Sequence, residues 1–131
     1  MVAALVMAMP GGKWGAFIII MVIVFILGMF IDWIGIIMIM VPIVSPIAIE
    51  LGFDPLWFAM MIIVNLQMSF LSPPFAYAIF FLKAVTTPEM KLDSIHIIRG
   101  VIPFIGLIMV GLLLFIKFPQ LILWLPGMMI K

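Results

Sequence analysis

Only one charged residue, Asp32, lies between Lys13 and Glu50. The segment from Leu56 to Leu82 contains no charge at all. Because an ionised side chain is costly in hydrocarbon, long segments of this kind are typical of chains that cross a bilayer. With 69% hydrophobic and 8% charged residues, the 131-residue chain has too few polar side chains to cover a soluble domain. The sequence therefore predicts an all-α integral membrane protein.

The composition also argues against several classes of function. The chain has no cysteine and one histidine, His96, so disulfides, thiolate metal sites and a zinc site made by this chain alone are not expected. A formal net charge of +1 gives no indication of a nucleic-acid partner. No Ser-His-Asp set and no pair of carboxylates at membrane depth indicates catalysis. We expect neither enzymatic activity nor a cofactor.

The hydrophobic segment from Trp14 to Ile49 is too long for one membrane helix, since at about 1.5 Å per residue it would extend over about 50 Å. We predict a helical hairpin over residues 13–54, with its turn around Gly28 to Trp33. Each arm has about 17 residues, at the lower limit for crossing a bilayer, so fully crossing arms and a re-entrant hairpin are both open. Asp32 is exposed to interfacial water in the first arrangement and lies deep in the membrane in the second.

The next segment, residues 55–82, is uncharged but carries polar residues and prolines in its middle. They are Asn65, Gln67, Ser69, Ser72, Pro73 and Pro74. The two prolines lack an amide hydrogen and disfavour helical geometry at the preceding serine, so a broken transmembrane helix is predicted. Backbone groups released at this depth are tolerated only inside protein or beside a water-filled cavity.

The break has two interpretations that the residues alone leave open. Discontinuous helices direct amide groups toward anions and carbonyl groups toward cations, which predicts a site for an ion or a solute. Proline kinks are also common in membrane helices, and their Ser and Asn side chains often bond only to a neighbouring helix.

The remaining segments are connections and a final helix. Residues 1–12 are expected to be the end of a truncated preceding transmembrane helix, because they are shorter than the roughly 20 residues that span a bilayer. Pro42 and Pro46 are expected to kink the second arm of the hairpin. Residues 83–96 are rich in charge and form a predicted interfacial loop, followed by a final transmembrane helix and C-terminal tail over residues 97–131.

A series of short motifs follows along the chain. It comprises Gly28–Asp32, Val41–Ala48, Leu51–Phe58, Val64–Gln67, Phe70–Phe75 and Gly100–Phe104. In order and spacing these motifs resemble the large permease (DctM-type) subunit of tripartite ATP-independent periplasmic (TRAP) transporters, over nearly all of the chain. Two positions depart from that family, which usually has Thr at the position of Ser72 and Gly at the position of Ala76.

The resemblance implies a sodium-coupled secondary transporter of the bacterial inner membrane that imports carboxylate-type organic anions such as C4-dicarboxylates. Its implied partners are a periplasmic solute-binding protein, a small membrane subunit and the remaining part of the large permease. The chain would then be the second repeat of an elevator-type transporter, with a re-entrant hairpin and a broken helix. The candidate ion- and substrate-binding residues are Gly28, Asp32, Asn65, Gln67, Ser69, Ser72, Pro73 and Pro74.

Permeases of that family are several times longer than this chain, so we expect a fragment, a split gene product or a degenerate reading frame. Two alternatives remain open. One is a small accessory membrane protein that moves no solute, and polar, proline-broken residues at membrane depth argue against it. The other is a fragment of a related sodium-coupled anion carrier.

Overall fold

The computed structural model describes residues 11–73, 76–87, 90–91 and 93–129. They form helices α2 (Gly12–Phe30), α3 (Trp33–Glu50), α4 (Pro55–Leu71), α5 (Tyr77–Val85), α6 (Ser94–Lys117) and α7 (Gln120–Met129), with no strand among them. Of these, α2, α3 and α6 are long and apolar enough to cross a membrane. The described part of the chain is all-helical, as the sequence predicts, and has the character of a multi-pass membrane protein.

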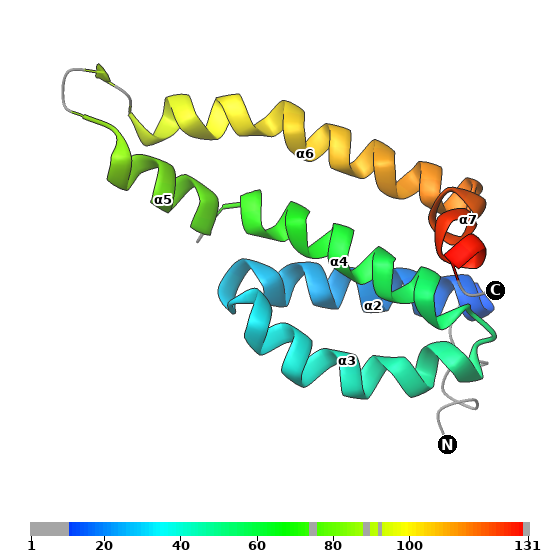
Figure 1. Ribbon diagram of the computed structural model, residues 1–131. Coiled ribbons are helices and arrows are strands. Elements are labelled where there is room, and N and C mark those ends of the chain that lie inside the picture. The colour runs from blue at the N-terminus through cyan, green and yellow to red at the C-terminus, as the bar shows by residue number, and fades with distance from the viewer. Residues whose placement is uncertain (1–10, 74–75, 88–89, 92, 130–131) are drawn as a thin grey trace.

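Helices α2 and α3 form a hairpin whose turn consists of Ile31 and Asp32. Ile31 is extended (φ −114°, ψ 141°), and Asp32 precedes α3 with φ −59° and ψ 148°. Helix α4 runs back along both arms, whereas α6 packs against α4 and α5 in turn (Figure 1). The hairpin turn lies near the end of α4 and not at the far end of α5 (Figure 1). The hairpin therefore extends only as far as the break between α4 and α5.

Local chemistry explains both ends of α4. At its start, Asp54 Oδ1 accepts hydrogen bonds from the backbone N–H groups of Leu56 and Trp57, at 2.9 Å and 3.0 Å. This satisfies amides that have no partner within the helix. At its end, Ser72 is extended (φ −87°, ψ 134°) because the following Pro73 disfavours a helical conformation there.

Helix α4 lies at the centre of the main core and packs against the hairpin and α7. The buried residues of this core are Phe17, Val24, Ile36, Val44, Ala48, Phe53, Trp57, Phe58, Met61, Ile62, Leu66 and Ile122. At the base of the hairpin, the rings of Trp14, Phe17, Phe53 and Trp57 contact one another with centroids 5.3 to 6.3 Å apart. The core thus fixes the open end of the hairpin to the start of α4.

The C-terminal part differs in detail from the segments predicted. Helix α5 extends to Val85, inside the predicted loop, and α6 already begins at Ser94. The predicted tail contains a separate helix, α7, because Phe118 leaves the helical conformation (φ −126°, ψ 72°) before Pro119. The predicted end of a preceding helix covers residues 1–12, and residues 1–10 of this segment lie outside the described residues.

Candidate functional site

The hairpin and the broken helix meet at Gly28. This glycine is buried near the end of α2, and a Cβ atom added to it would lie 2.8 Å from Ser69 Cβ and closer still to Ser69 Oγ. Carbon atoms do not approach so closely without displacement, so only glycine fits between the two helices here. The structure therefore brings together two of the candidate residues, one from each predicted element.

The two serines near the end of α4 donate their hydroxyl hydrogens to their own helix. Ser69 Oγ donates to the Leu66 carbonyl at 2.9 Å, and Ser72 Oγ donates to the Met68 carbonyl at 2.8 Å. The Ser72 N–H bonds the Ser69 carbonyl at 3.0 Å, replacing the amide that Pro73 lacks. Both serines are buried. Because a hydroxyl oxygen that donates its hydrogen still carries lone pairs, these oxygens are chemically suited to a cation.

Asn65 links the broken helix to the first arm of the hairpin. Its Nδ2 atom donates to the Met21 carbonyl at 2.8 Å, and the side chain is only 2% exposed. A buried amide with a partner on a neighbouring helix stabilises the packing of that pair. In the described structure Asn65 makes the interhelical hydrogen bond that the second interpretation of the break expects.

Ala76 stands at the start of α5 in a conformation that favours glycine. Its φ is 29° and its ψ is 66°, its side chain is 5% exposed, and its N–H bonds the Ser72 carbonyl at 3.2 Å. A Cβ atom is strained at positive φ, so the alanine at this position stores strain beside the break.

We expect Ala76→Gly to stabilise the protein by about 1 kcal/mol, because removing the Cβ relieves a positive φ and outweighs the added freedom of the unfolded chain. Thermal unfolding of the purified protein in detergent measures the change. The matched variant Ala78→Gly lies inside α5 at an ordinary helical position and is expected to lower stability. Equal destabilisation by both variants would contradict the assignment of strain to Ala76.

The other candidate residues lie toward the surface of the described structure. Asp32 and Pro73 are exposed, and the Asp32 carboxylate makes no capping hydrogen bond to α3. Gln67 is exposed and lines an open cavity of about 720 Å³ together with Trp33, just after the hairpin turn. Pro74 lies outside the described residues. This cavity therefore borders both the hairpin turn and the helix break.

The polar side chains among the candidate residues carry hydroxyl, amide and carboxylate groups, whereas the cavity beside Gln67 is lined mostly by apolar side chains. Within the described ranges, no three His, Cys, Asp or Glu side chains come together. Transition metals prefer imidazole and thiolate ligands, whereas hard cations prefer oxygen. The ligand types of these candidate residues thus favour a hard cation over a transition metal.

One interhelical contact was not predicted from the sequence. The Trp57 Nε1–H group donates to the Phe115 carbonyl at 3.0 Å, from α4 to α6. Phe115 lies four residues before Pro119, which has no N–H to give it. The position of Pro119 in the sequence indicates that the Phe115 carbonyl has no amide donor four residues ahead. Only the fold shows that the Trp57 side chain is the donor.

The sequence profile described as "Tripartite ATP-independent periplasmic transporter, DctM component" matches residues 1–121. The chain belongs to this family. The resemblance read from the motifs is thereby confirmed. No solved structure matches the chain significantly.

Curated relatives of the DctM family are much longer than this chain. The C4-dicarboxylate TRAP transporter large permease protein of Vibrio cholerae is 29% identical over 102 residues, which is 78% of this chain and 22% of the relative. The 2,3-diketo-L-gulonate TRAP transporter large permease protein of Escherichia coli is 32% identical over 107 residues, 82% of this chain and 24% of the relative. The sialic acid TRAP transporter permease protein of Haemophilus influenzae is 33% identical over 104 residues, 79% of this chain and 16% of the relative. The chain therefore spans no more than about a quarter of these permeases.

Proposed function

We propose that this chain is the C-terminal part of the large permease of a TRAP-type transporter that imports carboxylate-type organic anions across the bacterial inner membrane. Family membership supports membrane transport. The names of three relatives refer to C4-dicarboxylates, 2,3-diketo-L-gulonate and sialic acid, all of them organic acids. One further relative is named for isethionate, so the group of solutes within the family is broader than C4-dicarboxylates.

The contact between Gly28 and Ser69 is the observation that carries this proposal. It joins the C-terminal end of α2, next to the hairpin turn, to the C-terminal end of α4, just before the break. Both arms of the hairpin pack against α4, and the hairpin turn lies near the break (Figure 1). A hairpin that ends beside a helix break inside a membrane protein is suited to a re-entrant arrangement, in which irregular backbone lines a cavity and not lipid. We assign this unit to the moving part of an elevator-type carrier.

Within this unit, the proposed sodium and solute ligands come from both elements. The hydroxyl oxygens of Ser69 and Ser72 and the Asp32 carboxylate are ligand types suited to sodium. Gln67 and the backbone around Gly28 and the two prolines, Pro73 and Pro74, supply polar groups for the solute. Asn65 holds α4 against α2 and so positions these groups.

The proposed partners follow from the family and from the length of the chain. The remainder of the large permease supplies the opposing repeat, because this chain covers 22 to 24% of the large permeases of Vibrio cholerae and Escherichia coli. A small membrane subunit and a periplasmic solute-binding protein complete the transporter, in keeping with the tripartite name of the family.

The sodium ligands can be tested in the complete permease reconstituted in proteoliposomes. We expect Ser72→Val and Asp32→Asn each to weaken the dependence of solute uptake on sodium without lowering the amount of permease in the membrane. Each change removes an oxygen ligand or a negative charge from the proposed site. Uptake of radiolabelled solute, measured against sodium concentration, provides the readout.

Ser72→Thr serves as the control, because it keeps the hydroxyl group and is expected to keep the sodium dependence. Unchanged sodium dependence in both Ser72→Val and Asp32→Asn would remove these residues from the site. Loss of permease from the membrane would instead assign them a structural role.

A further inference from the structure

An aromatic pair joins α4 to α5 across the break. Phe70, near the end of α4, and Tyr77, the first residue of α5, stack with ring centroids 5.9 Å apart and an angle of 14° between their planes. Stacked rings at this separation attract one another beyond the area that they bury. Ser72 and Ala76 both lie outside the helical conformation, so no continuous helix fixes α5 relative to α4. The ring pair helps to set this relation instead.

The start of α5 depends on contacts of this kind. Ala76 directly precedes Tyr77 and has a φ of 29°, and a strained backbone conformation persists only where the surrounding structure holds it. On the side of α6, Ala76 and Ile79 form a small core with Ile97. On the side of α4, the Tyr77 ring lies against Phe70. Contacts with both neighbouring helices therefore position α5, which has only 9 residues.

Phe70 belongs both to the stack and to the wall of the cavity beside Gln67. This cavity of about 720 Å³ is lined by Gln67 and Phe70 from α4, Trp33 from α3 and Ala78 from α5, among others. Phe70 is only partly buried, so its side chain has room to adopt another rotamer unless a partner holds it. The Tyr77 ring is such a partner. Without it, the Phe70 ring is free to turn into the cavity.

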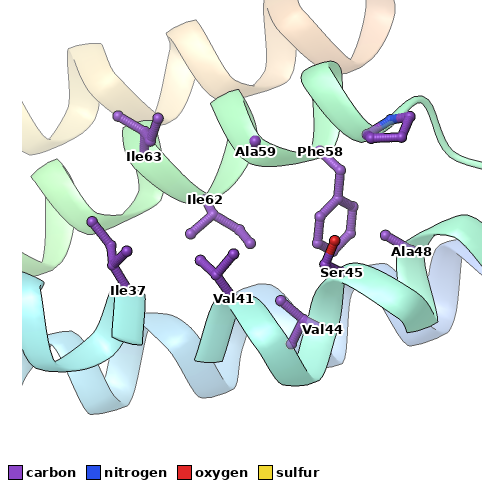
Figure 2. Close-up of a pocket in the computed structure, with 10 residues that line it drawn as sticks. Ile37, Val41, Val44, Ser45, Ala48, Phe58, Ala59, Ile62 and Ile63 are labelled. Atoms are coloured by element: carbon purple, nitrogen blue, oxygen red, sulfur yellow. The ribbon is translucent and has the colours of Figure 1, made fainter. Parts of the chain in front are cut away.

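The hairpin side of the same cavity is less firmly backed. Ile37 and Ile63 line this cavity and also a second one, of about 140 Å³, between α3 and α4 (Figure 2). Side chains that border empty space lack packing partners on that side, so their positions are less strictly fixed. Apart from Ser45, the side chains around the second cavity are apolar, which does not suit an organic anion. The stack with Tyr77 is therefore a contact that gives the larger cavity a defined wall.

We propose that Tyr77 is a positioning residue for the transported solute: its ring holds Phe70 in the wall of the larger cavity and so keeps the space beside Gln67 open. Tyr77 is not among the residues that line this cavity, so it acts through Phe70 and not by touching the solute. The inference rests on the proposed function, in which Gln67 supplies a polar group for the solute. It adds a residue that lies outside the sequence motifs of the family resemblance.

Uptake by the complete permease in proteoliposomes, measured against solute concentration, tests this role. The probe is whichever of radiolabelled succinate, 2,3-diketo-L-gulonate or sialic acid the wild-type permease takes up. We expect Tyr77→Ala to raise the KM about two- to tenfold with little change in the maximal rate, because a displaced Phe70 ring occupies space that the solute needs. Tyr77→Phe keeps the ring and is expected to keep the wild-type KM. Phe81→Ala, which removes a 62% exposed ring from the same helix, is the matched control and is expected to change neither quantity.

A double-mutant cycle shows whether Tyr77 acts through Phe70. Phe70→Ala removes the ring from the cavity wall, so Tyr77→Ala is expected to add little to the KM in that background. Additive effects of the two substitutions would overturn the inference. An unchanged KM in Tyr77→Ala, or a Tyr77→Phe variant as impaired as Tyr77→Ala, would overturn it as well.

A fluorine label on the ring separates this inference from the proposed function. With para-fluorophenylalanine in place of Phe70, fluorine NMR of the solute-free permease in detergent is expected to show one resonance. A second or broadened resonance is expected with Tyr77→Leu, which keeps apolar volume and so guards against loss of the folded protein. A single unchanged resonance would overturn the inference. Absence of uptake of all three probes by the wild-type permease would instead count against the proposed function, and the ring measurement would still stand.

Discussion

We expect Gly28→Ala to abolish most of the solute uptake by the complete permease and to lower its stability by about 1 to 3 kcal/mol or more. The added methyl group would lie 2.8 Å from Ser69 Cβ and nearer to Ser69 Oγ, so one of the two helices must move. Ser69 is 1% exposed and hydrogen-bonded within α4, so it has little room to give way. The initial rate of uptake and thermal unfolding in detergent measure the two effects.

The matched control is Gly100→Ala, because nothing lies within 4 Å of a Cβ atom built at Gly100 in α6. Replacement of this helical glycine is expected to raise stability by up to about 1 kcal/mol. Combining Gly28→Ala with Ser69→Gly removes the atoms that clash, and this double variant is expected to recover part of the lost stability. Normal uptake and stability in the Gly28→Ala single variant would show that the close contact between the hairpin and the broken helix is dispensable.

The hairpin and the break could be predicted because local chemistry sets both. The apolar sequence on either side of Asp32 is too long for a single membrane helix, so the chain must turn back on itself. The structure has this turn at Ile31 and Asp32. The two prolines exclude a continuous helix beyond Ser72, and α4 ends at Leu71. These features depend on neighbours in the chain, so a single sequence is enough to find them.

The roles of the polar residues at the break could not be predicted because they depend on which helices pack together. The sequence placed Asn65 among the site candidates, whereas the fold directs its Nδ2 to the Met21 carbonyl. The resemblance to the TRAP permeases implies that Gly28 and Ser69 belong to one site, but the close approach of Ser69 to Gly28 depends on how α2 packs on α4.

Trp57→Ala is expected to lower the stability of the permease by about 3 to 5 kcal/mol. The indole is 4% exposed and its ring contacts those of Trp14, Phe17 and Phe53, so its removal opens a cavity at the base of the hairpin. The same change leaves the Phe115 carbonyl without its donor. Thermal unfolding in detergent, or denaturation titrated in mixed micelles, measures the loss. Trp124→Ala is the control, since Trp124 is 61% exposed on α7 and its removal is expected to have little effect.

A second substitution at the same position separates packing from hydrogen bonding. Trp57→Phe keeps an aromatic ring but removes the N–H, and the resulting unpaired carbonyl is expected to cost about 1 to 3 kcal/mol. Pro119→Ala gives the Phe115 carbonyl an amide of its own, so the double variant is expected to lose less stability than the sum of the two single variants, by about 1 kcal/mol. Strict additivity would show that this carbonyl does not require the indole.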